Sequence, residues 1–169
     1  SLVGRDDELS AVGRALNDHR LVTLVGPGGV GKTRLALEVG RQRQRHYADG
    51  AWLIDLAPLT DESLVPGAVA TTLRVQESAD GPLTETLTDA LAGRDLLLIV
   101  DNCEHLIEAC AEMVEALLAA CPHVAVLATS REALAIAGEV TWPVSPLATP
   151  PERQRSALTD LELAALAAL

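Results

Sequence analysis

Two kinds of hydrophobic pattern alternate along this chain. One is a short run of consecutive apolar residues, such as LLLIV at positions 96–100, which is typical of a strand buried on both faces of a sheet. The other is a longer segment in which apolar residues recur every three or four positions, as in a helix with one buried face. The expected strands cover residues 21–25, 51–56, 96–100, 124–128 and 140–144. The expected helices cover residues 6–19, 32–46, 63–73, 83–92 and 104–120.

The alternation of strands and helices predicts an α/β fold. Solidly apolar strands separated by helices indicate a parallel sheet covered by helices on both sides, which makes three layers. A proline-rich stretch, SPLATPP at positions 145–151, is expected to be a linker. We therefore expect one domain over residues 1–147. Residues 148–169 would form a linker and the start of a second, helical domain within a longer protein.

The charge balance argues against nucleic-acid binding by this part of the protein. Asp and Glu number 24 against 13 Lys and Arg, and the formal net charge is −11, whereas nucleic-acid binders need a cationic face. The chain also lacks a run of about 18 apolar residues, so we expect no membrane span. The three cysteines, Cys103, Cys110 and Cys121, fit no zinc spacing. We expect them to be buried thiols in a cytoplasmic protein.

The only lysine of the chain lies inside a glycine-rich octet, GPGGVGKT at positions 26–33. The octet fits the phosphate-binding pattern G-x-x-x-x-G-K-[ST], and it lies between an expected strand and an expected helix, as that motif requires. Loop amides and the helix N-terminus would face phosphate oxygens, Lys32 would reach the β- and γ-phosphates, and Thr33 would offer a hydroxyl to Mg²⁺. The expected nucleotide-binding residues here are Gly26, Pro27, Gly28, Gly29, Val30, Gly31, Lys32, Thr33 and Arg34.

Asp101 follows directly after the apolar run at 96–100. The carboxyl end of a buried parallel strand lies at the same edge of the sheet as the phosphate loop, so this carboxylate could hold Mg²⁺ through water, as a Walker B aspartate does. The sequence therefore predicts a magnesium site formed by Thr33 and Asp101.

The segment ATSRE at positions 128–132 follows the fourth expected strand. Arg131 could reach the γ-phosphate there and report whether it is present. Thr129 and Glu132 also fit a capping box that would open another helix. Both interpretations stay open, because a capped helix would hold the arginine in place.

Together, these motifs resemble the STAND class of P-loop ATPases, and most closely the NB-ARC-like nucleotide-binding modules of large bacterial transcriptional regulators of the SARP and LuxR types. The resemblance implies an ASCE-type sheet with strand order 5-1-4-3-2 in a P-loop nucleotide-binding domain, ATP or ADP with Mg²⁺, and a γ-phosphate sensor at Arg131. It makes Val3, Arg5 and Pro146 candidate contacts to the base or sugar. The segments that carry it are VGRDDEL, LVTLVGPGGVGKTRLALEV, DGAWLIDLAPL, LLLIVDNCEHL and ACPHVAVLATSREAL.

The chain departs from many relatives at Asn102, where they have a second acid. An amide can orient water but cannot accept its proton. Glu104 could substitute, and the expected catalytic residues are therefore Lys32, Asp101, Glu104 and Arg131. This departure favours slow hydrolysis in an ATP/ADP switch within a multidomain regulator, with the other domains of the chain as partners and possible nucleotide-dependent self-association.

Two other functions stay open: a small-molecule kinase and a nucleotide-binding scaffold without hydrolysis. A GTPase does not fit, because guanine selection usually uses an [NT]-K-x-D loop and the single lysine is Lys32.

Overall fold

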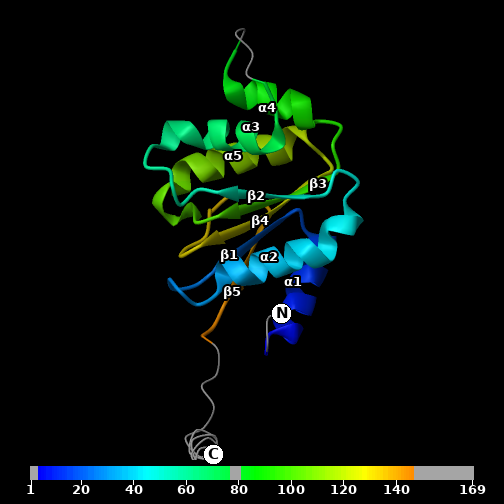
Figure 1. Ribbon diagram of the computed structural model, residues 1–169, viewed down its shortest axis with the longest axis vertical. Coiled ribbons are helices and arrows are strands. Elements are labelled where there is room, and N and C mark those ends of the chain that lie inside the picture. The colour runs from blue at the N-terminus through cyan, green and yellow to red at the C-terminus, as the bar shows by residue number, and fades with distance from the viewer. Residues whose placement is uncertain (1–3, 77–80, 147–169) are drawn as a thin grey trace, which may run out of the picture.

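The computed structural model of the protein describes residues 4–76 and 81–146. Five parallel strands form one sheet in the order β2-β3-β4-β1-β5 (Figure 1). Read from the other edge, this is the order 5-1-4-3-2, so the prediction is confirmed. The strands are β1 (Leu21–Val25), β2 (Ala51–Asp55), β3 (Leu96–Asp101), β4 (Val124–Ser130) and β5 (Glu139–Pro143). The helices are α1 (Asp6–Asp18), α2 (Lys32–Arg43), α3 (Val65–Leu73), α4 (Leu83–Leu91) and α5 (Ile107–Ala120), with 3-10 turns at Gln44–His46, Glu62–Leu64 and Cys103–His105.

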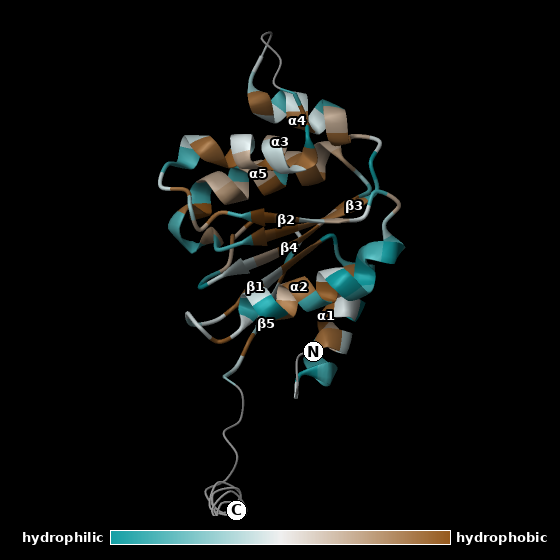
Figure 2. Cartoon of the chain, viewed as in Figure 1, coloured by the Kyte–Doolittle hydropathy of each residue, from teal (hydrophilic) through white to brown (hydrophobic). Residues whose placement is uncertain are grey.

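Helices cover both faces of the sheet. Figure 1 shows α3, α4 and α5 on one side and α1 and α2 on the other. The all-apolar strand β3 serves both cores: Leu98 and Val100 pack toward α3, α4 and α5, while Leu97 and Ile99 pack toward α1 and α2. Figure 2 shows brown strands between helices that mix brown residues with teal and white ones. The three-layer α/β architecture is therefore confirmed.

Helix α2 packs unusually close to the sheet at Gly40. A Cβ at this position would lie 2.3 Å from Ile99 Cδ1. The absence of a side chain at Gly40 lets α2 lie directly on β3.

The expected element boundaries hold to within a few residues. The capping-box interpretation of Thr129 and Glu132 is wrong: residues 131–138, all of which the structure describes, contain bends and turns but no helix. Thr129 therefore caps no helix there. It lies within β4, and its hydroxyl bonds to another strand. The Glu132 N–H is instead bonded to Ser130 Oγ at 3.3 Å.

Two predictions fall outside the described residues, namely Val3 as a base or sugar contact and a second domain starting within 148–169. Within the described part of the chain, no helix is both long and apolar enough to cross a membrane.

Candidate nucleotide-binding site

The glycine-rich loop connects the end of β1 to the start of α2, as its sequence context required. Its last glycine, Gly31, precedes α2 with φ of 97°, a left-handed conformation that residues with a Cβ rarely adopt. Its first glycine, Gly26, lies so close to the segment after β5 that a Cβ there would be 2.8 Å from Val144 O. Glycine is thus required at both ends of the loop, at one by conformation and at the other by space.

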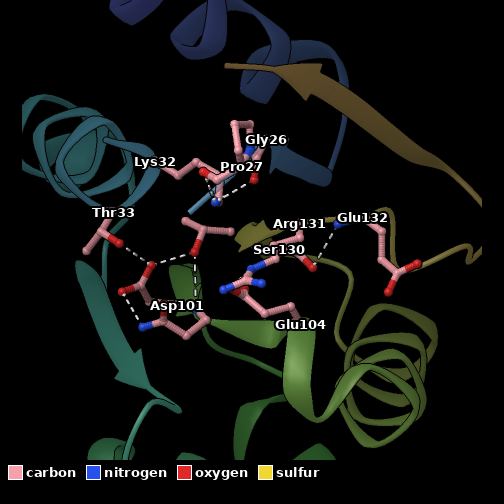
Figure 3. Close-up of polar contacts among 11 residues, drawn as sticks. Gly26, Pro27, Lys32, Thr33, Asp101, Glu104, Ser130, Arg131 and Glu132 are labelled. Carbon is pink, nitrogen blue, oxygen red and sulfur yellow. Dashed lines mark hydrogen bonds and ion pairs between the residues drawn. The ribbon is translucent and has the colours of Figure 1, made fainter. Parts of the chain in front are cut away.

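Lys32 folds back over the loop that precedes it (Figure 3). Its Nζ donates to Gly26 O at 2.8 Å and to Pro27 O at 3.1 Å, and the residue is only 7% exposed. The ammonium group is therefore already positioned over the loop, and a phosphate could replace these neutral carbonyl oxygens with charged acceptors.

Thr33 and Asp101 meet although they are 68 residues apart. Thr33 Oγ1 donates to Asp101 Oδ1 at 2.9 Å at the carboxyl edge of the sheet. A hydroxyl and a carboxylate are hard oxygen ligands, and Mg²⁺ is commonly bound by one or two such groups together with substrate phosphates. The donor set therefore fits Mg²⁺. No cluster of three or more His, Cys, Asp or Glu suited to a metal occurs in residues 4–76 and 81–146.

The Asp101 carboxylate is 4% exposed and is held by three donors. Besides Thr33, the hydroxyl of Thr129 donates to Oδ1 at 2.5 Å, and Asn102 Nδ2 donates to Oδ2 at 3.0 Å. Sequence reasoning missed this role of Thr129. The expected strand order was the available signal, because it placed β4 beside β3 and brought the two strand ends together.

Asn102 has left-handed backbone angles, φ 64° and ψ 48°. Asparagine tolerates this conformation better than most residues. Its N–H donates to Thr129 Oγ1 at 3.1 Å, so Asn102 helps to orient the hydroxyl that bonds to Asp101.

Arg131 lies between the loop and Glu104. Its Nε is 3.2 Å from Glu104 Oε1 (Figure 3), and its Nη2 is 3.5 Å from the place where a Cβ on Gly28 would be. Glu104 Oε2 is buried and has no hydrogen-bond partner. The two residues predicted as sensor and base are thus brought together as an ion pair beside the loop.

The remaining predicted contacts lie in different surroundings. Pro146 is exposed at the end of the segment after β5, and Arg34 is exposed on α2. Arg5 is 3% exposed, and its guanidinium bonds to main-chain carbonyls of the loop and of the segment after β5. These three assignments remain predictions.

Cys103 lies two residues after Asp101 and is fully buried. A hydrogen bond with Cys110, followed by burial, raises the pKa of the Cys103 thiol well above its usual value. The thiol therefore stays neutral and unreactive, which agrees with the expectation of a buried thiol.

A parallel sheet with this strand order, a glycine loop leading into a helix, and an aspartate beside the first helical threonine define a P-loop NTPase fold. The AAA domain family matches residues 15–136, and the chain belongs to that family. It is an AAA-type nucleotide-binding domain.

Its sequence relatives are bacterial. An uncharacterised protein of Mycobacterium tuberculosis is 44% identical over 147 residues, which cover 87% of this chain and 37% of that protein. A protein of the same organism named as a candidate HTH-type transcriptional regulator is 43% identical over 76% of this chain and 14% of its own length. The regulatory protein AfsR of Streptomyces griseus is 34% identical over 64% of this chain and 11% of its own length. The chain thus spans well under half of each of these relatives.

Solved structures agree on the fold. A STAND protein with a tetratricopeptide repeat sensor from Pyrococcus horikoshii superposes with a TM-score of 0.59 at 18% identity, covering 85% of this chain and 23% of that one. The structure of Drosophila ORC bound to DNA superposes with a TM-score of 0.69 at 16% identity. This match covers 96% of this chain and 48% of that chain. At these identities the likeness shows the fold alone. Together, the family and these relatives confirm the recognition made from the motifs, a P-loop ATPase domain of the kind found in bacterial regulators.

Proposed function

We propose that this domain is an ATP/ADP-binding switch with slow Mg²⁺-dependent hydrolysis that controls a multidomain transcriptional regulator. The observation that carries the proposal is the convergence of Lys32, Thr33 and Asp101 at one edge of the sheet. An ammonium group over the loop and a hydroxyl beside a carboxylate are the groups that a Mg²⁺-bound polyphosphate requires.

Each residue has a separate task. Lys32 exchanges its two loop carbonyls for oxygens of the β- and γ-phosphates. Thr33 and Asp101 would hold Mg²⁺, which would neutralise phosphate charge. Thr129 and Asn102 keep the Asp101 carboxylate oriented through their hydrogen bonds.

The Arg131–Glu104 pair supports a switch rather than a fast enzyme. While the pair is intact, Glu104 is held by the arginine, and its second oxygen is out of contact with water. A γ-phosphate would compete with Glu104 for the guanidinium. Glu104 would then be free to accept a proton from the attacking water. Hydrolysis would be slow because Arg131 must first exchange Glu104 for the γ-phosphate. ADP has no γ-phosphate and would leave the Arg131–Glu104 pair intact.

Single-turnover hydrolysis tests the role of Glu104. Glu104→Gln should lower the rate at saturating ATP by about a hundredfold or more, within the range for general base catalysis. Glu115→Gln, an exposed position on α5, serves as the matched control and should leave the rate unchanged. If the parent hydrolyses ATP at a measurable rate and Glu104→Gln keeps that rate, Glu104 is excluded as the base. If the parent shows no turnover at all, the result favours a nucleotide-binding scaffold without hydrolysis.

The regulatory role rests on the relatives named as regulators, of which this domain spans a small part. We infer that other domains of the same chain receive the nucleotide signal and that the acidic charge of this domain leaves DNA contact to them. Size-exclusion chromatography coupled to light scattering, with ADP and with a non-hydrolysable ATP analogue, tests nucleotide-dependent self-association.

A further inference from the structure

Arg5 makes three polar contacts, two of which join distant parts of the chain. Its Nη1 pairs with Glu8 Oε2 at 2.7 Å. Its Nη2 donates to Val30 O, in the phosphate loop, at 2.8 Å and to Ser145 O, after β5, at 2.9 Å. Such an arrangement suits the planar fork of arginine, which holds several acceptors in fixed directions.

The segment after β5 also contacts the first residue of the loop. Val144 N–H donates to Val25 O at 2.8 Å, and Val144 O lies 2.8 Å from where a Cβ on Gly26 would be. The segment is thus tied to the beginning of the loop by direct packing and to its end through Arg5. The loop cannot change shape at either end without affecting Val144 or Ser145.

We propose that Arg5 is a positioning residue that couples the phosphate loop to the chain leaving β5. A phosphate that reorganises the loop amides also moves the Val30 carbonyl. Arg5 passes this movement to Ser145 because one guanidinium nitrogen holds both carbonyls. This inference rests on the proposed nucleotide binding and gives that switch a physical route to whatever follows Pro146 in the chain.

Arg5→Gln and Arg20→Gln form a matched pair of variants for the test. Arg20 likewise donates to two main-chain carbonyls, Cys121 O at 3.0 Å and Leu118 O at 2.8 Å, but lies just before β1, at the opposite edge of the sheet. Each substitution removes a charge and two carbonyl bonds, and Arg5→Gln also removes the pair with Glu8. Thermal denaturation of both variants therefore accompanies the test, to separate a loss of stability from a loss of coupling.

The readouts are calorimetric titration with ADP and with tripolyphosphate, both with Mg²⁺, and hydrogen exchange of the amides of Val144 and Ser145. The parent protein and Arg20→Gln should bind ADP with the same affinity. In both, bound ADP should lower the exchange rate of these amides. In Arg5→Gln, both ligands should bind about tenfold more weakly, equivalent to 1.4 kcal/mol. The exchange at Val144 and Ser145 should also no longer respond to ADP. If Arg5→Gln does not fold, Arg5→Lys carries the same test, since the lysine Nζ falls one bond short of the position from which Nη2 bonds both carbonyls.

Each other outcome has a distinct meaning. Weaker ADP binding with parental tripolyphosphate binding would make Arg5 a base or sugar contact and overturn the proposal. The proposal would also be overturned if Arg5→Gln bound both ligands and exchanged its amides as the parent does. It would likewise be overturned if Arg20→Gln lost as much ligand affinity and as much of the exchange response as Arg5→Gln. If the parent binds ADP without any change in exchange at Val144 and Ser145, this coupling alone is refuted. If the parent binds no nucleotide, the proposed function is refuted as well.

Discussion

Replacing Lys32 by methionine tests the central electrostatic interaction of the site. Methionine keeps an unbranched stem that can fill much the same space, while the ammonium group is lost. In the free protein the variant loses the bonds to Gly26 O and Pro27 O. Pro27 is exposed and its carbonyl can turn to water, so we expect the free energy of unfolding to fall by only about 1 kcal/mol.

The loss in the nucleotide complex should be larger. There the ammonium group would face phosphate oxygens, and hydrogen bonds to charged groups contribute about 1.5–3 kcal/mol. Affinity for Mg²⁺-ATP should therefore fall roughly tenfold to over a hundredfold.

Calorimetric titration with Mg²⁺-ATP measures this loss, and thermal denaturation shows whether the variant is folded. Because the protein already carries a net charge of −11, loss of any cation could weaken binding of an anion. Arg45→Met, an exposed position just after α2, controls for that effect and should bind almost as the parent does. Equal ATP affinity in Lys32→Met and the parent would refute the assignment of the loop.

Three further predictions address the sensor, the packing of α2 and the surface charges. Arg131→Ala should weaken ATP binding more than ADP binding in parallel titrations, and equal losses would make Arg131 purely structural. Gly40→Ala should lower the melting temperature by the equivalent of about 1–3 kcal/mol, because its Cβ would overlap Ile99 Cδ1; Ile99→Val in the same chain removes that atom and should restore part of the loss. Hydrogen bonds from Arg41 and then Gln42 lower the pKa of Glu38 from 4.5 to about 2. Since the folded pKa is depressed, its stabilising contribution is complete above pH 4.5 and is lost as the pH falls toward 2, and an NMR titration midpoint near 4.5 would contradict this.

Much of the site was predictable because its parts are local in sequence. The glycine loop lies between one strand and one helix, and the apolar run before Asp101 had to be a buried strand. The resemblance to P-loop ATPases then supplied the strand order, and the meeting of Thr33 with Asp101 follows from that order. The capping box at Thr129 and Glu132 failed for the opposite reason. A four-residue pattern describes what a local segment can form, and here the hydroxyl had a stronger partner on a neighbouring strand.

The sequence by itself determined the layered α/β fold and the phosphate loop, because periodicity and the glycine motif act over a few residues. Only the tertiary structure decided that Thr129 orients Asp101, that Arg131 pairs with Glu104, and that Arg5 joins Val30 to Ser145. These contacts link residues 25 to 140 positions apart. They depend on strand register and on the paths of loops, which no local pattern encodes.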